Sequence, residues 1–258
     1  MADFRQQGRG GVGAKASAAR DEDFIEYVHQ ANMHSTMMFF TEQGRLYWTK
    51  VYELPEGNRQ SKGRALQNMI NIQKGDKVCA FIHVKNLNDM EYVQNHYLIF
   101  ATKDGLMKKT TLESYSRPRA NGIIALGLRE GDRLIRVTLT DGNSQMLVAS
   151  YNGKVVRFPE DTVRPMGRTA TGVRAIKLDE DGQDRVIGMI CVEEGSKESV
   201  LVISEKGFGK RTDLDDENGE PIYRITNRGG KGVKTMNLTD KTGNLIGLEA
   251  VTDEQDLM

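Results

Sequence analysis

The sequence has few of the residues on which covalent and metal sites are usually built. Only two of its 258 residues are cysteines, and both Cys79 and Cys191 lie in apolar runs. Such a pair is typical of buried, reduced thiols, so we expect no disulfide framework. The four histidines show no ligand spacing with cysteines or carboxylates, so we predict no metal site.

Catalytic and membrane motifs are also missing. The sequence has no phosphate-binding loop G-x-x-x-x-G-K-[ST], no nucleophile elbow G-x-S-x-G, and no carboxylate pair that stands out from ordinary surface charge. No apolar run approaches the roughly 20 residues that a membrane helix needs, and no signal peptide precedes the first charged residues. We therefore expect a cytoplasmic protein that does not contact membranes, has no catalytic residues of its own and needs no cofactor.

Neither sign of charge dominates, because 36 Lys and Arg residues balance 36 Asp and Glu residues. Any nucleic-acid binding must therefore depend on where the charges lie. Four glycine loops contain basic residues and no acidic ones, namely residues 58–67, 116–127, 163–177 and 224–234. The acidic residues collect elsewhere, at 21–23, 179–181, 193–194 and 213–217. This segregation is what a one-sided electrostatic surface needs.

One hairpin pattern occurs four times along the chain. Each repeat has an apolar strand, a turn ending in glycine, a second strand and a basic loop with another glycine. The turn glycines are Gly44, Gly105, Gly153 and Gly207, and the loop glycines, Gly13, Gly63, Gly122, Gly172 and Gly232, recur after 50, 59, 50 and 60 residues. Glycine accepts the positive φ of such turns, and repeats of this length are typical of propeller-like arrays.

We expect four strands in each repeat, which is the number in a propeller blade. Opening strands are predicted at 78–84, 134–139, 186–192 and 245–251, with 21–30 as a further example, and closing strands at 65–70, 123–128, 173–178 and 233–238. The repeats then span about 23–71, 72–128, 129–178 and 179–238, with partial units at 1–22 and 239–258. We predict an all-β fold, a single propeller-like β-pinwheel of four-stranded blades, incomplete at both ends.

The most specific motif is the segment Gln7-Gly8-Arg9-Gly10-Gly11-Val12-Gly13. It resembles the gyrase A-subunit box, Q-R-R-G-G-K-G, with glycine in place of one arginine and valine in place of the lysine. Segments at 52–55, 62–64, 163–168 and 171–174 resemble the repeats of the same family, so the resemblance covers essentially the whole chain. The sequence is therefore similar to the C-terminal DNA-wrapping domain of the DNA gyrase A subunit.

The resemblance implies a function in DNA topology. Such a domain binds, bends and wraps double-stranded DNA without sequence preference, and it supports ATP-dependent negative supercoiling by the type II topoisomerase holoenzyme. The implied partners are the B subunit, in an A2B2 assembly, together with the rest of the A subunit, in the bacterial cytoplasm and associated with the nucleoid. ATP and Mg²⁺ would be used elsewhere in the holoenzyme. Two alternatives stay open, a topoisomerase IV C-terminal domain and a protein-binding propeller scaffold.

We expect three groups of residues to contact DNA. The box loop would fasten one end of the duplex through Gln7, Arg9, Gly10, Gly11, Gly13 and the neighbouring Lys15. The basic loops would form the track through Arg59, Lys62, Arg64, Arg117, Arg119, Arg164, Arg168, Arg174, Arg228 and Lys231. Four residues after each turn glycine stand Trp48, Lys109, Arg157 and Arg211. We expect these three cations to form an exposed stripe along the rim, and Trp48 to pack rather than stack on bases.

Overall fold

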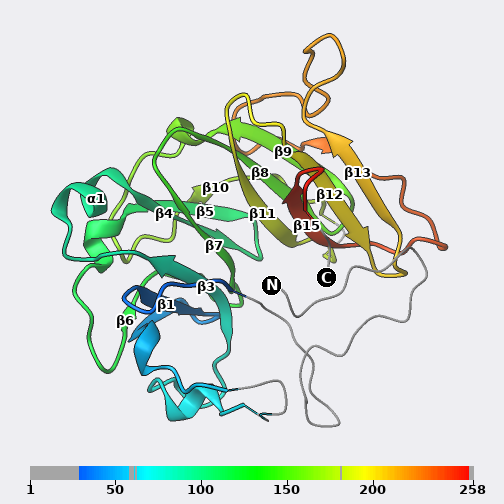
Figure 1. Cartoon of the computed structure of the whole chain (residues 1–258). Coiled ribbons are helices and arrows are strands. Elements are labelled where there is room, and N and C mark those ends of the chain that lie inside the picture. The colour runs from blue at the N-terminus through cyan, green and yellow to red at the C-terminus, as the bar shows by residue number, and fades with distance from the viewer. Residues whose placement is uncertain (1–28, 58–60, 62, 181, 256–258) are drawn as a thin grey trace.

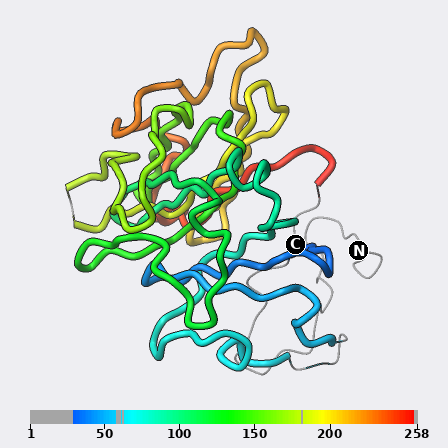
Figure 2. The backbone as a smooth tube through the Cα atoms, turned by 90° about the vertical axis from the view of Figure 1, so that its left-hand side faces the viewer, coloured from blue at the N-terminus to red at the C-terminus, as the bar shows by residue number. Residues whose placement is uncertain are grey.

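The computed structural model describes residues 29–57, 61, 63–180 and 182–255. Strands dominate this part of the chain, and they form four antiparallel sheets that follow one another around the molecule in chain order (Figure 1). Three sheets have four strands and the last has three. Figure 2 places the first hairpin, in blue, in the lower half of the molecule and the fourth, in yellow and orange, in the upper half. The predicted all-β array of small sheets is confirmed.

Each sheet is built on one of the four predicted hairpins. These are β1 (Thr36–Thr41) with β2 (Arg45–Lys50), β4 (Tyr97–Thr102) with β5 (Leu106–Thr111), β8 (Ser144–Ser150) with β9 (Lys154–Pro159), and β12 (Ser199–Ser204) with β13 (Gly209–Asp213). The four turn glycines have φ between +74° and +83°. Only glycine enters this left-handed region without a Cβ penalty, which is why the sequence pattern located the turns correctly.

The other strands of each sheet come from the repeat that follows its hairpin. On the inner side, the first strand of each hairpin pairs with a long strand, β3 (Val78–Val84), β7 (Leu134–Thr140), β11 (Val186–Glu193) or β15 (Leu245–Val251). On the outer side of the first three hairpins lies a two-residue strand, β6 (Ile123–Ile124), β10 (Val173–Arg174) or β14 (Val233–Lys234). The strand orders are β3-β1-β2-β6, β7-β4-β5-β10, β11-β8-β9-β14 and β15-β12-β13.

Each sheet therefore combines strands from two consecutive sequence repeats, and the predicted assignment of all four strands of a blade to one repeat is wrong. We expected the opening and closing strands of a repeat to pair with the hairpin between them. Both pair instead with the hairpin of the preceding repeat, so β3 and β6 flank the first hairpin rather than the second. Periodicity fixes the spacing of strands along the chain, but it does not say which of two neighbouring hairpins a strand joins.

Helical structure is short wherever it occurs in the described residues. The closing strand predicted at 65–70 is wrong, because this segment contains a 3-10 helix, Leu66–Asn68. Its counterparts pair with a preceding hairpin, and the described residues contain no hairpin before β1. An unpredicted helix, α1 (Met90–Asn95), is capped by Asp89, which accepts a hydrogen bond from the amide of Tyr92 at 3.0 Å. Further 3-10 helices follow the hairpins at Val51–Glu53, Leu112–Tyr115 and Glu160–Thr162. Most of the strand predicted at 21–30 lies outside the described residues.

The hydrophobic core lies between neighbouring sheets. Alternate residues of β4 face opposite ways, so that Phe100 packs against Phe40 of the first sheet, with ring centroids 5.6 Å apart, while Ile99 packs with Met146 of the third. A further cluster, which includes Leu147, joins the third and fourth sheets. Because both faces of the middle sheets are buried, the first strands of their hairpins, β4 and β8, contain continuous apolar runs.

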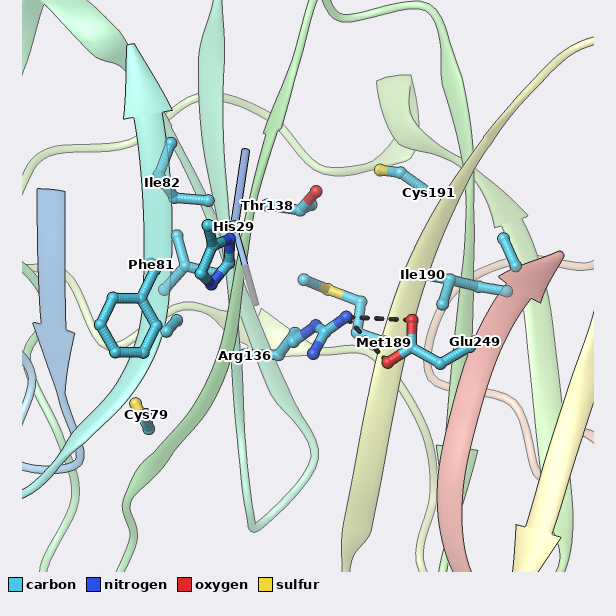
Figure 3. A pocket seen from close by; sticks show the side chains of 13 residues that line it. His29, Cys79, Phe81, Ile82, Arg136, Thr138, Met189, Ile190, Cys191 and Glu249 are labelled. Carbon is cyan, nitrogen blue, oxygen red and sulfur yellow. Dashed lines mark hydrogen bonds and ion pairs between the residues drawn. The ribbon is translucent and has the colours of Figure 1, made fainter. Parts of the chain in front are cut away.

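The inner strands β3, β7, β11 and β15 surround a central cavity of about 510 Å³. Arg136 of β7 and Glu249 of β15 point toward each other there (Figure 3), and one guanidinium nitrogen lies 3.1 Å and 3.2 Å from the two carboxylate oxygens. Cys79 and Cys191 also line the cavity, on β3 and β11. Burial raises the pKa of each thiol to about 12.

Candidate nucleic-acid interface

The loop glycines bring each basic loop onto the sheet before it. Gly122, Gly172 and Gly232 have φ of +65°, +97° and +73°. A Cβ atom on any of them would lie 2.4–2.6 Å from a backbone carbonyl oxygen of the preceding hairpin. Gly63 also has a positive φ, but a Cβ there would meet nothing within 4 Å. The first three glycines therefore have a steric role in seating β6, β10 and β14, which the sequence did not reveal.

The basic loops form one continuous outer edge, which we call the basic rim and define as residues 116–127, 163–177 and 224–234. The amide of Gly127 donates a hydrogen bond to the carbonyl of Ala170 at 3.2 Å, which joins the first loop to the second. The amide of Lys177 donates to the carbonyl of Gly230 at 2.8 Å, which joins the second to the third. The loops accompany β6, β10 and β14, the outermost strands of their sheets.

Seven of the predicted track residues lie on this rim. Arg168 is half-buried, and the others are exposed, namely Arg117, Arg119, Arg164, Arg174, Arg228 and Lys231. The ion pairs within the described part of the chain include none of these seven side chains. The rim loops contain no carboxylate, and the one ion pair of the described residues that involves a rim loop joins Lys177 to Glu180 at 3.9 Å. The structure thus brings these seven cations together along one edge.

Arg64 is exposed but lies outside the rim, beside the 3-10 helix Leu66–Asn68 and next to residues that the structure does not describe. Arg59 and Lys62 are outside the described residues. The same holds for the whole box loop, whose predicted contacts are Gln7, Arg9, Gly10, Gly11, Gly13 and Lys15. Their roles remain predictions.

The stripe of exposed cations predicted after the hairpin turns is wrong at Lys109. This side chain is 4% exposed, and its Nζ lies 2.7 Å from a carboxylate oxygen of the fully buried Glu160. The Lys109 ammonium also lies 4.2 Å from the centre of the Tyr97 ring. Glu160 follows the next hairpin along the chain, so the ion pair joins the second sheet to the third.

Arg157 has the same connecting role and is only 5% exposed. One of its guanidinium nitrogens lies 3.0 Å from a carboxylate oxygen of Asp215 and 3.1 Å from the carbonyl of Leu214, both of which follow the fourth hairpin. Its Nε donates to the side-chain oxygen of Gln145 at 2.7 Å. Burial of the aliphatic stem and fixed hydrogen bonds at the head remove this arginine from the surface.

In the first and fourth hairpins, the residues four positions after the turn glycine are Trp48 and Arg211. Trp48 packs, as expected, and its indole N–H donates at 3.1 Å to the carbonyl of Tyr115, in the 3-10 helix after the second hairpin. Arg211 is exposed, but its guanidinium lies 2.5 Å from a carboxylate oxygen of Asp253. The position four residues after the turn glycine therefore connects each of the first three hairpins to the segment that follows the next hairpin.

The comparisons with known proteins agree with this architecture. The sequence matches the family model described as DNA gyrase C-terminal domain, beta-propeller, over residues 1–32, 35–85, 96–141, 145–193 and 198–252. The chain belongs to this family. It is 42% identical over 255 residues to the A subunit of DNA gyrase from Staphylococcus aureus (strain NCTC 8325 / PS 47) and from Staphylococcus epidermidis (strain ATCC 12228 / FDA PCI 1200). Those residues are 99% of this chain but 27% of each relative, so the chain spans about a quarter of their length.

Two solved structures share the fold of this gyrase C-terminal family member. The C-terminal domain of DNA topoisomerase IV superposes with a TM-score of 0.75 at 24% identity, over 93% of this chain and 70% of that one. The DNA gyrase A C-terminal domain superposes with a TM-score of 0.70 at 19% identity, over 98% and 78%. At these identities the likeness shows the fold alone.

The described residues offer little besides this charged edge. They include no helix long and apolar enough to cross a bilayer. They also include no group of three or more His, Cys, Asp and Glu side chains placed to hold a metal ion. The basic rim is therefore the surface on which a functional hypothesis can be built.

Proposed function

We propose that this chain binds duplex DNA along its basic rim, without sequence preference, and bends the duplex around the successive sheets. The main support is that seven cations without an ion pair among the described residues lie on three loops, which are hydrogen-bonded to one another in sequence order. Arginine and lysine bind phosphate oxygens, and such contacts position a protein on DNA without reading its bases. Membership of the gyrase C-terminal family supports the same conclusion.

In this mechanism, many weak contacts between rim cations and phosphates offset the elastic energy of bending the duplex. Bending a 20–30 bp site by 40–90° costs about 1–6 kcal/mol. Each phosphate contact releases counterions and contributes about −0.9 to the slope of log K against log salt. If each of the seven rim cations contacts one phosphate, the expected slope is about −6. Contacts distributed along a curved edge offset the bending cost only when the duplex follows that edge.

In the cell, we propose that this domain acts within a larger type II topoisomerase of the gyrase kind. It would hold a wrapped segment while the B subunit, in an A2B2 assembly, works with the rest of the A subunit to cleave and pass DNA with ATP and Mg²⁺. The proposed place is the bacterial cytoplasm, at the nucleoid. The staphylococcal relatives, which are gyrase A subunits about four times as long as this chain, support this assignment.

A gel-shift titration on a random-sequence duplex across a salt series tests DNA binding. The expected result is binding at low salt, with a slope near −6 for the wild-type chain. Arg117→Ala/Arg119→Ala should reduce the magnitude of the slope by about 2. Lys197→Ala is the matched control, because Lys197 is exposed but lies outside the rim, and it should leave the slope unchanged. Absence of binding at low salt would favour a protein-binding scaffold.

Relaxation of a plasmid by topoisomerase I in the presence of the chain tests bending into a wrap. A wrapped duplex changes the linking number of the relaxed product, whereas simple binding does not. We expect a shift that grows with protein concentration until the DNA is saturated. Arg9→Ala tests the fastening role predicted for the box loop, and an unchanged shift in that variant would remove this role.

A further inference from the structure

Two neighbouring loops of the basic rim meet at one buried lysine. Lys108 of β5 is 0% exposed, and its Nζ lies 2.5 Å from the carbonyl oxygen of Ala125 and 2.5 Å from that of Arg168. Ala125 belongs to the rim loop 116–127, and Arg168 belongs to the rim loop 163–177. A single amine therefore donates hydrogen bonds to the backbones of both loops.

The surroundings of Lys108 fix its position. Its Nζ lies 3.1 Å from the hydroxyl of Tyr115 and 4.7 Å from the centre of the Phe100 ring. The Tyr115 hydroxyl also donates to the carbonyl of Ala125 at 2.8 Å. Tyr115 and Arg168 are the titratable or charged residues whose side chains act on the amine, and the ion pairs of the described residues do not include Lys108. A protonated amine has three N–H donors and a neutral one has two, so both carbonyls can be satisfied in either state.

An equivalent contact recurs in the fourth hairpin. Lys210 stands three residues after its turn glycine, as Lys108 does, and its Nζ donates to the carbonyl of Thr235 at 3.0 Å. Thr235 stands three residues after the loop glycine Gly232, as Ala125 does after Gly122. A lysine at this position thus holds the backbone of the following loop in two of the four repeats.

We propose that Lys108 is a positioning residue for DNA binding, which holds the loops 116–127 and 163–177 at the separation at which their arginines contact one duplex. This inference rests on the proposed function. Lys108 is buried and cannot itself reach a phosphate, so its contribution must pass through the loops. Without it, the amide of Gly127 and the carbonyl of Ala170 keep one hydrogen bond between the loops.

The salt dependence of duplex binding separates positioning from direct contact. Lys108→Met removes the donors at similar volume, and we expect the magnitude of the salt slope to fall by about 2, with about 100-fold weaker binding at 0.1 M salt. Arg119→Ala, which removes one direct contact, should lose about 1 in slope and about tenfold in affinity. Lys108→Gln keeps an N–H₂ donor and should bind within about threefold of wild type.

Each outcome of this experiment decides the question. A folded Lys108→Met chain with the wild-type slope overturns the proposal, and so does a Lys108→Gln chain that binds as weakly as Lys108→Met. If Lys108→Met does not fold, Tyr115→Phe replaces it, because this change removes the hydroxyl that contacts both Nζ and the Ala125 carbonyl. The expected loss is then about 1 in slope, and no loss overturns the proposal. A wild-type chain that lacks a steep slope refutes the proposed function itself.

Discussion

Glu160 should be one of the most sensitive positions of the fold. Its carboxylate is fully buried and accepts three contacts, from the Lys109 ammonium at 2.7 Å, the Thr140 hydroxyl at 2.6 Å and the Ser144 amide at 3.2 Å. In Glu160→Ala, the ammonium of Lys109 stays buried without its counter-charge. Breaking a buried pair from one side typically costs about 3–5 kcal/mol.

The assay is urea and thermal unfolding of the wild type and three variants. A loss of about 3–5 kcal/mol lowers the melting temperature of a chain of this size by about 6–20 °C. The double variant Lys109→Met/Glu160→Leu removes both charges, and we expect it to lie within about 2 kcal/mol of wild type. Glu249→Ala is the control. The side chains of Glu249 and Arg136 are 54% and 36% exposed, so their ion pair should contribute about 0–1 kcal/mol.

Two results would refute this reasoning. A cost below about 1 kcal/mol for Glu160→Ala would mean that the ammonium finds water or another acceptor when the carboxylate is removed. A double variant as unstable as the single one would mean that the packing of the site, rather than its charge balance, stabilises the contact between the sheets.

Three further predictions concern glycine, thiol and lysine chemistry. Gly172→Ala should cost about 2–5 kcal/mol in urea unfolding, because left-handed strain of about 1–2 kcal/mol adds to the clash of a Cβ that would lie 2.4 Å from a backbone oxygen. Gly63→Ala, with open space around the Cβ, should cost only the strain of about 1–2 kcal/mol, and equal costs would contradict the seating role. Alkylation of Cys79 and Cys191 at pH 8, followed by mass spectrometry, should be about 1000-fold slower than for an ordinary thiol, because burial raises their pKa to about 12, and unfolding in urea should abolish the difference. Burial and the nearby Arg168 lower the pKa of Lys108 from 10.5 to about 7, so the unfolded chain binds more protons between these values; stability should rise by about 2–3 kcal/mol from pH 7 to pH 9. Lys108→Met should lack that rise, and a wild-type profile as flat as the variant's would show that the amine keeps its ordinary pKa.

The hairpins and their turns could be predicted from the sequence because their determinants are local. A glycine between two apolar runs carries the positive φ of the turn, and all four turn glycines adopt it. The basic rim could also be predicted from the sequence, since its loops combine glycine with cations and contain no carboxylate. The charge of a loop is visible in its own residues wherever the loop lies in the fold.

The partners of the buried cations could not be predicted, because they are distant in sequence. Lys109 pairs with Glu160, 51 residues later, and Arg157 pairs with Asp215, 58 residues later. Nothing in the sequence around either cation distinguishes it from Arg211, which stands at the same place in its repeat and is exposed. The capped helix α1 had a local signal, Asp89, but a single turn and a half of helix is too short for periodicity to show.

Completion of each sheet by the following repeat determines how mechanical load passes through the domain. The loop 116–127 lies in the second repeat and contributes β6 to the first sheet, while a hydrogen bond from Lys108 connects it to the second sheet. An outward pull on this loop is therefore resisted by two sheets at once. For the same reason, the repeats are not interchangeable modules, because excising residues 72–128 as a block would remove both flanking strands of the first hairpin.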